Sequence, residues 1–425
     1  MVKRVLCSAV VLMALCSCKS APQPGATDSG PAVERERRVI MISIDGCRWD
    51  YLEDEGLVNL KAIRDNGAFA TQTTVTNPSM TAPGHVTLIT GAWAGTHGIV
   101  FNKFYDRELG LVKFFGGIPP AQQTDYLLAE PVWSSAEKAG LTTAAVHWAA
   151  TAGPYQGEEV DHVLPYVSSV DDQQRLAQGA ALFLEERPHL LMIYTSGVSA
   201  MTYKHGVGSV QVTDKLRKLD GWIGNLVQDV QQSDMAEETD IIVVSDHGFG
   251  APLEKELCLS WLLDDQGIGY DFVLWGAVGQ VFLQDPADAE AVATLVKSQE
   301  GVSTALIGSQ AEQLHLATKQ RTGDVIVIME QGWQVANMWR PCESAAVEVQ
   351  QGYESAGTHG YPAEVDEDMR GIFMAAGPHV KQVDLGIVRQ IDIAPTVSAL
   401  LNIPPPANSD GQALDIVLGP AAGTN

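Results

Sequence analysis

Short apolar runs of strand length alternate with longer segments whose apolar residues recur at helical spacing, along most of this chain. Several of the runs are rich in Val and Ile and end at polar or glycine residues, which favours buried strands. Strands that alternate with helices are typical of a parallel sheet covered by helices on both faces. We therefore expect an α/β fold built on a mostly parallel, doubly wound sheet.

The expected elements can be placed by residue number. We expect strands at 39–44, 142–148, 190–194, 240–245 and 371–376, and helices at 57–66, 132–139, 173–186, 210–232 and 391–401. Between about 251 and 354 the alternation weakens, although 325–328 still has the composition of a strand. We therefore predict a main domain of residues 39–250 and 355–420, with residues 251–354 inserted as a cap subdomain.

The size and charge of the chain limit what it can bind. With 425 residues, of which 45% are hydrophobic, the chain can bury a sizeable core in one or two domains. Its formal net charge of −25 is spread along the sequence. Such a surface repels polyanions, so we expect a small-molecule partner and no polymeric nucleic acid.

The first residues have the features of an export signal. Two basic residues precede an apolar run over 5–15, and the Leu-Cys-Ser-Cys that follows resembles a bacterial lipobox ending at Cys18. We expect residues 1–18 to be a lipoprotein signal peptide, Cys18 to be lipidated and residues 19–38 to form a flexible linker. The protein would then lie on the periplasmic or cell-surface side of a bacterial membrane. Ordinary signal cleavage near Ala21, which leaves a soluble periplasmic protein, is the alternative.

Membrane contact is expected through the N-terminal lipid only, because no later apolar run approaches the roughly 20 residues that span a bilayer. Three cysteines lie beyond the signal, namely Cys47, Cys258 and Cys342. An odd number leaves at least one thiol unpaired within the chain. Cys258 and Cys342 are a candidate disulfide, although the sequence does not establish the pairing.

Polar residues follow two of the expected strands directly. Asp45 comes after the strand at 39–44, and Asp246 with His247 comes at the end of the strand at 240–245. In doubly wound sheets the carboxyl ends of the strands meet at the edge where ligands bind. Carboxylates and an imidazole at that edge suit Zn²⁺. For each Asp taken singly, a helix-capping or turn role is the alternative.

Thr81 opens a helical segment that carries a proline two residues later. Threonine is a good N-cap residue, so Thr81 could simply cap this helix. A hydroxyl at the positive end of a helix and next to a metal could instead act as a nucleophile. We expect His85 and His97, within and just after the helix, to be structural.

Five motifs carry a family resemblance when they are taken together in chain order. They are Ile-Asp-Gly at 44–46, Asn-Pro-Ser-Met-Thr-Ala-Pro-Gly-His at 77–85, His-Gly-Ile-Val-Phe-Asn at 97–102, Ser-Asp-His-Gly at 245–248 and Gly-Thr-His-Gly-Tyr at 357–361. The chain resembles the alkaline phosphatase superfamily over about 39–411, and most closely its type I phosphodiesterase/nucleotide pyrophosphatase branch. That resemblance implies an alkaline phosphatase-like main domain that is catalytic.

The resemblance also implies roles for individual residues. Thr81 would be the covalent nucleophile of a metal-dependent phosphoester hydrolase, and Asn102 would hydrogen-bond a phosphate oxygen. The remaining implied residues are metal ligands: Asp45, Thr81, Asp246 and His247 at the first zinc, and His359 at the second. The substrate would be a small phosphoester. A diester or pyrophosphate is favoured, because 147–154 lacks the Lys-x-Arg clamp of some monoesterases.

The second metal site departs from the family pattern. Ser199 and Tyr203 stand where the family carries an Asp and a His. A neutral hydroxyl and a phenol are poor zinc ligands. In one interpretation His205 joins His359 in a rearranged site and two zinc ions bind. In the other, which we favour, the second metal is lost, and the protein is a one-metal enzyme or a non-catalytic binding protein.

Overall fold

The computed structural model describes residues 36–349 and 355–418. The expected signal peptide, with Cys18, and nearly all of the linker at 19–38 lie outside the described residues. Lipidation and localisation therefore stay predictions. Among the described residues, no helix has the length and apolar content needed to cross a bilayer.

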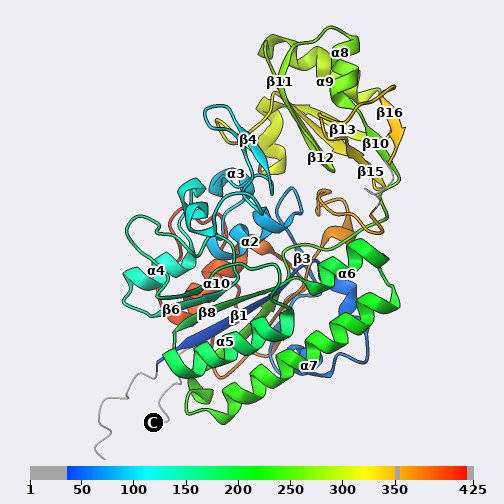
Figure 1. The fold of residues 1–425 in the computed structure, drawn as a ribbon. Coiled ribbons are helices and arrows are strands. Elements are labelled where there is room, and N and C mark those ends of the chain that lie inside the picture. The colour runs from blue at the N-terminus through cyan, green and yellow to red at the C-terminus, as the bar shows by residue number, and fades with distance from the viewer. Residues whose placement is uncertain (1–35, 350–354, 419–425) are drawn as a thin grey trace, which may run out of the picture. The chain divides into compact units, whose positions relative to one another are not determined.

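A large sheet forms the centre of the fold (Figure 1). Its middle strand is β1 (Arg38–Ile44), whose residues are all buried, and it pairs in parallel with β8 (Leu190–Thr195) and β9 (Thr239–Val244). The complete strand order is β18-β2-β17-β9-β1-β8-β6-β7. The outer strands are β2 (Ala68–Phe69), β6 (Thr143–Val146), β7 (His162–Leu164), β17 (Phe373–Ala376) and β18 (Val383–Asp384).

The sheet is mostly parallel, as predicted, but the late strand β17 is an exception. It runs antiparallel to both β9 and β2, while the other pairs in the sheet are parallel. Successive side chains of β1 point to opposite faces of the sheet. Val39 and Met41 belong to the apolar cluster on one face, and Ile40 and Ile42 belong to the cluster on the other. This confirms an α/β sheet buried on both sides.

Helices cover the two faces separately. One face is covered by α2 (Thr81–Thr90), α4 (Val132–Lys138) and α10 (Ile393–Leu401). The other is covered by α1 (Val58–Asp65), α5 (Asp172–Glu186) and α7 (Val210–Gln232). Shorter elements complete this part of the chain: β3 (Gln72–Thr74), α3 (Ala94–His97), β4 (Phe104–Asp106), β5 (Gly110–Val112), α6 (Gly197–His205) and β19 (Ile387–Arg389).

Residues 255–348 form two further sheets around a third apolar cluster. The four-stranded sheet has the order β11-β12-β14-β13 and is antiparallel throughout. The elements here are β10 (Lys255–Leu257), α8 (Leu259–Asp265), β11 (Tyr270–Leu274), β12 (Val278–Leu283), α9 (Ala289–Lys297), β13 (Val302–Ile307), β14 (Val325–Met329), β15 (Trp333–Val335) and β16 (Ala346–Glu348). We keep the division of the chain into a main domain and a cap at 251–354 as a prediction.

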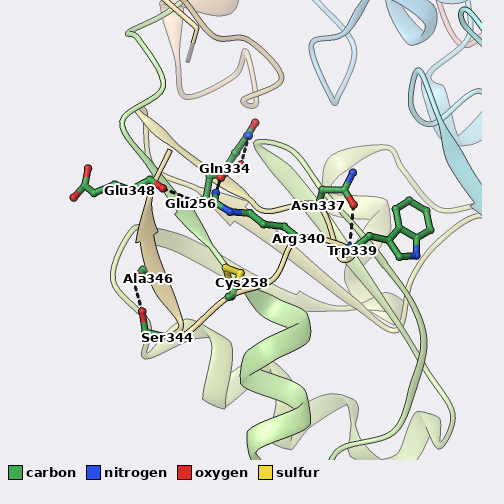
Figure 2. Close-up of a disulfide and its surroundings, with 10 residues drawn as sticks. Glu256, Cys258, Gln334, Asn337, Trp339, Arg340, Ser344, Ala346 and Glu348 are labelled. Carbon is green, nitrogen blue, oxygen red and sulfur yellow. Dashed lines mark hydrogen bonds and ion pairs between the residues drawn. A yellow bond between two sulfur atoms is a disulfide. The ribbon is translucent and has the colours of Figure 1, made fainter. Parts of the chain in front are cut away.

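A disulfide joins Cys258 and Cys342 in this second region (Figure 2). It ties the start of α8 to the loop that precedes β16. The same loop is held by an ion pair between Arg340 and Glu256, and Glu256 also accepts a hydrogen bond of 2.7 Å from the Gln334 side chain. The remaining thiol among the described residues, Cys47, is free and buried.

Candidate functional site

Asp45, Asp246 and His247 come together at the carboxyl ends of β1 and β9. His247 Nε2 lies 3.6 Å from Asp45 Oδ1 and 3.3 Å from Asp246 Oδ2, and all three side chains are buried. One donor atom from each residue lies within 4.8 Å of the other two. Among the described residues, this is the one cluster of three or more His, Cys, Asp or Glu that could hold a metal ion.

The hydrogen bonds around the cluster leave two oxygen atoms unused. Asp45 Oδ2 accepts a hydrogen bond of 2.6 Å from the hydroxyl of Tyr194, and Asp246 Oδ1 accepts bonds of 3.0 Å from the amides of Gly46 and His247. Asp45 Oδ1 and Asp246 Oδ2 accept no hydrogen bond, although both are buried and histidine nitrogens lie 3.3–3.6 Å away. Buried carboxylate oxygens without a partner are costly. A divalent cation beside His247 Nε2 would satisfy both, so the donor set fits a zinc-like ion.

Burial controls protonation in this cluster. It raises the pKa of Asp45 to about 6, with the hydroxyls of Tyr194 and Ser199 opposing the rise. Burial, followed by the charge of Asp45, raises the pKa of Asp246 well above its usual range. Burial also lowers the pKa of His247 well below its ordinary value. The neutral imidazole is the form that binds metals, and a bound cation would favour the ionised carboxylates.

Thr81 is the first residue of α2, and its hydroxyl lies 3.4 Å from His247 Nε2. The N-cap position belongs to Met80, which makes no side-chain capping bond. The alternative that Thr81 serves as the N-cap is therefore wrong. A methyl group in place of Gly84 would lie 2.7 Å from the carbonyl oxygen of Asp246. The glycine therefore allows the start of the helix to approach the carboxylate.

His85 holds the start of α2 in place. Its Nδ1 donates a hydrogen bond of 2.8 Å to the carbonyl of Thr81, and its Nε2 lies 2.8 Å from the hydroxyl of Ser43 in β1. His97 is likewise buried, with Nε2 3.0 Å from the hydroxyl of Thr87. Burial lowers the pKa of His85 to about 4, so the ring is neutral. Both histidines have the structural contacts that we expected.

Asn102 lies next to the same helix end. Its Oδ1 accepts a hydrogen bond of 2.7 Å from the amide of Ala82. This bond orients the side chain and leaves the Nδ2 group as the donor for a ligand. Asn102 also lines a cavity of about 290 Å³ together with Tyr203 and His359. The cavity therefore offers the Asn102 amide as a hydrogen-bond donor and lies next to the start of α2, through Met80.

This cavity extends toward the second region of the chain. Leu274, Trp275 and Ala277 line it on that side, and Lys103 is the one Lys, Arg, Asp or Glu in its lining. A larger cavity of about 760 Å³ lies between α1, α7 and the ends of β9 and β17. Its lining contains no Asp, Glu, His, Lys or Arg, so it offers no group for acid–base or metal chemistry.

The residues of the expected second metal site are also brought together. The hydroxyl of Tyr203 forms a hydrogen bond with Nε2 of His359. Ser199, one turn earlier in α6, lies near Asp45 and lowers the pKa of that carboxyl. His205 is the last residue of α6, and no hydrogen bond joins it to His359 in the part of the chain that the structure describes.

Two contacts that support the Asp45 and Asp246 carboxylates were not predicted from the sequence. Tyr194 ends the strand expected at 190–194, and its hydroxyl donates a hydrogen bond to Asp45. Gln390 donates a hydrogen bond of 2.9 Å to the carbonyl of Asp246 from a segment far along the chain. A tyrosine beside the carboxyl end of an otherwise aliphatic strand was the available signal for the first. Nothing in the sequence marks the second.

A helix-borne hydroxyl beside a candidate cation site, at the carboxyl edge of a doubly wound sheet, is an arrangement suited to phosphoryl transfer. The family model described as type I phosphodiesterase / nucleotide pyrophosphatase matches residues 39–362. The chain therefore belongs to this family of phosphoric ester hydrolases in the alkaline phosphatase superfamily. The resemblance seen in the motifs is confirmed.

Individual relatives agree with this assignment. The chain is 24% identical over 392 residues to mouse ectonucleotide pyrophosphatase/phosphodiesterase family member 7, covering 89% of this chain and 87% of the relative. It is 25% identical over 371 residues to human family member 5, covering 87% and 75%. The solved structure of human member 5 matches with a TM-score of 0.74 at 23% identity, covering 90% of this chain and 100% of that one. An inactive murine member 5 in complex with AMP matches with a TM-score of 0.72 at 22% identity, covering 87% and 96%.

Proposed function

We propose that this chain is a metal-dependent phosphoester hydrolase that uses Thr81 as its covalent nucleophile. The observation that carries the proposal is the position of the Thr81 hydroxyl. It lies at the first residue of a buried helix, 3.4 Å from His247 Nε2 and beside two carboxylates with unpartnered oxygens. A helix cap has no need of such neighbours, whereas an activated hydroxyl does.

Asp45, Asp246 and His247, together with the Thr81 hydroxyl, would hold one divalent cation, for which zinc suits the mixed oxygen and nitrogen donors. Such a cation supplies a lowered pKa for the hydroxyl and neutralises charge that develops on the phosphoryl group. Tyr194 orients Asp45, and the amides of Gly46 and His247 orient Asp246, so the carboxylates are fixed before substrate arrives.

The reaction then has two displacements at phosphorus. In the first, Thr81 Oγ1 forms a bond to phosphorus as its proton is lost, the bond to the leaving-group oxygen breaks, and that oxygen takes up a proton. Asn102 Nδ2 and the N-terminus of α2 donate hydrogen bonds to the non-bridging oxygens. In the second, the oxygen of water bonds to phosphorus and loses a proton, the bond between phosphorus and Thr81 Oγ1 breaks, and Oγ1 takes up a proton.

The substrate is proposed to be a small diester or pyrophosphate of the nucleotide type. The relatives named above are ectonucleotide pyrophosphatase/phosphodiesterases, and one neighbouring structure holds AMP. The cavity joins Asn102 to an aromatic wall at Trp275, which suits a leaving group with a flat ring. Residues 147–154 provide no cation that could bind a dianionic monoester.

Substitution at Thr81 tests the proposal. Thr81→Ala should reduce turnover of a bis-aryl phosphodiester at least a hundredfold, because the attacking oxygen is gone, while the melting temperature stays near that of the parent. Thr90→Ala is the matched control, since Thr90 lies in the same helix and bonds the carbonyl of Val86 instead. Thr81→Ala with more than a tenth of parental activity would rule out the covalent role.

A non-catalytic binding protein is the second candidate function, favoured by the Tyr203–His359 hydrogen bond at the expected second metal site. A binding protein should bind a nucleotide or phosphodiester without turning it over, in the parent as in Thr81→Ala. Detectable, Thr81-dependent release of the aryl alcohol by the metal-loaded parent would exclude it.

A further inference from the structure

We propose that Tyr203 has replaced the second metal of this site, so that the chain binds one divalent cation instead of two. The hydroxyl of Tyr203 is hydrogen-bonded to Nε2 of His359, the nitrogen that would otherwise bind the metal. Tyr203 and His359 therefore form a neutral hydrogen-bonded pair. The inference rests on the proposed function only in taking Asp45, Asp246 and His247 as the site of the one cation.

The hydrogen bonds of His359 determine which nitrogen is available. Nδ1 lies 2.7 Å from the carbonyl oxygen of Ser79, which can only accept, so Nδ1 carries the proton of the neutral ring. The lone pair is therefore on Nε2, and a metal ligand of this kind binds through that nitrogen while its other N–H donates to a carbonyl. The hydroxyl of Tyr203 donates into the same lone pair. A metal and the phenol cannot both use it.

Aromatic contacts orient the phenol, although Tyr203 is 44% exposed. The Phe249 ring packs edge-on against both Tyr203, at 5.0 Å between centroids, and His359, at 4.9 Å. His359 in turn stacks on His247 at 3.8 Å. The neutral ring of Tyr203 therefore packs beside His359 at the position where the family pattern has a histidine ligand.

Too few other donors remain for a second cation. Ser199 lies one turn before Tyr203 on the same face of α6, near Asp45. A neutral serine hydroxyl is a weak ligand. Among the described residues, the Asp45 cluster is the one group of three or more His, Cys, Asp or Glu placed to hold a metal.

The helical geometry also excludes His205 as a substitute. Residues on an α-helix are separated by about 100° of rotation each, so His205 is turned about 200° away from Tyr203. With Tyr203 facing His359, His205 faces the opposite side of α6 and could reach the site only if the last turn unwound. We therefore assign no ligand role to His205.

The replacement has a chemical consequence for the second displacement. The water that attacks phospho-Thr81 has no second cation to lower its pKa, so the bond between phosphorus and Thr81 Oγ1 breaks slowly. The adduct should then accumulate during turnover. Intact-mass spectrometry of acid-quenched protein detects it as the mass of the transferred group, and Thr81→Ala should lack it.

The direct experiment counts zinc. The full chain is stripped of metal, titrated with zinc by isothermal calorimetry, and measured by elemental analysis after desalting. We expect one tightly bound zinc in the parent and one in Tyr203→Phe, which keeps the ring and adds no ligand. The double variant Ser199→Asp with Tyr203→His should bind two zinc ions, and its turnover should rise more than tenfold.

Each result decides between stated alternatives. One zinc in the parent with two in the double variant supports the inference. Two zinc ions in the parent would overturn the inference while leaving the proposed function intact. If His205→Ala then bound only one zinc ion, His205 would be identified as the ligand of the second. One zinc in a folded double variant would also overturn the inference. A parent that binds no zinc would instead overturn the proposed function, so failure of the inference and failure of the proposed function give different zinc counts. If the double variant does not fold, the number of zinc ions bound by the parent still decides.

Discussion

Tyr194→Phe isolates the contribution of one hydroxyl to the cation site. That hydroxyl donates to Asp45 Oδ2 at 2.6 Å in a fully buried position, while the ring packs against His85 at 4.7 Å. Phenylalanine keeps the ring and removes only the hydrogen bond. A hydrogen bond to a charged group is worth about 1.5–3 kcal/mol, and loss of a residue that orients a metal ligand weakens metal affinity about 10–100-fold.

We therefore expect the dissociation constant for zinc to rise about 10–100-fold in Tyr194→Phe, or roughly 1.4–2.7 kcal/mol. Competition with a chromophoric chelator measures the constant. Activity should recover at saturating zinc, because Thr81 and Asn102 are unaffected. Tyr166→Phe is the matched control, since its ring lies 6.0 Å from Tyr194 and its hydroxyl does not contact Asp45. An unchanged zinc affinity in Tyr194→Phe would refute the idea that this bond prepares Asp45 for a cation.

Two further predictions concern other parts of the chain. We propose that the protein is anchored outside the cytoplasm by a lipid on Cys18, so Cys18→Ser should move it from the membrane fraction to the soluble fraction. Equal partitioning of variant and parent would contradict the anchor. Burial, and then the charge of Asp161, raise the pKa of Glu137 to about 7. Folding therefore favours protonated Glu137, and this contribution to stability is lost as pH rises from about 4.5 through 7. Glu137→Gln should gain melting temperature relative to the parent between pH 5 and pH 8, and a constant difference would show that Glu137 titrates normally.

The sequence predicted the central sheet well because its signals are local. The strand expected at 39–44 appears as Arg38–Ile44, and the helix expected at 210–232 has the same bounds in the structure. Both are long periodic segments whose character depends on their own residues. The direction of β17 depended instead on where the chain returned to the sheet edge, which no local pattern encodes. The same is true of the two sheets within 255–348, which are built from short strands with long connections.

The candidate site also has a part that local sequence signals predicted and a part that they did not. Asp45, Asp246 and His247 could be placed at one edge because each directly follows a strand, and strand direction decides the edge. Their supporting contacts depend on tertiary packing. Tyr194 reads as one more apolar position in its strand, and only the pairing of β8 with β1 brings its hydroxyl to Asp45. The pairing of Tyr203 with His359 joins residues 156 apart in sequence, so motif positions could show that zinc ligands were missing but not what occupied their place.

The charge balance of the site connects its metal count to its substrate. Ser199, Tyr203 and His359 are neutral in the hydrogen bonds that they form, so one dication between Asp45 and Asp246 leaves a cluster with no net charge. A dication attracts each phosphate charge at about 4 Å by about 8 kcal/mol in an environment of effective dielectric constant 20, so a lost dication matters more for a dianion than for a monoanion. A monoester dianion would therefore lose more from the missing second cation than a diester monoanion. Lys103 adds a single positive charge to the cavity lining, which matches a monoanionic phosphodiester and offsets only part of what a monoester would lack.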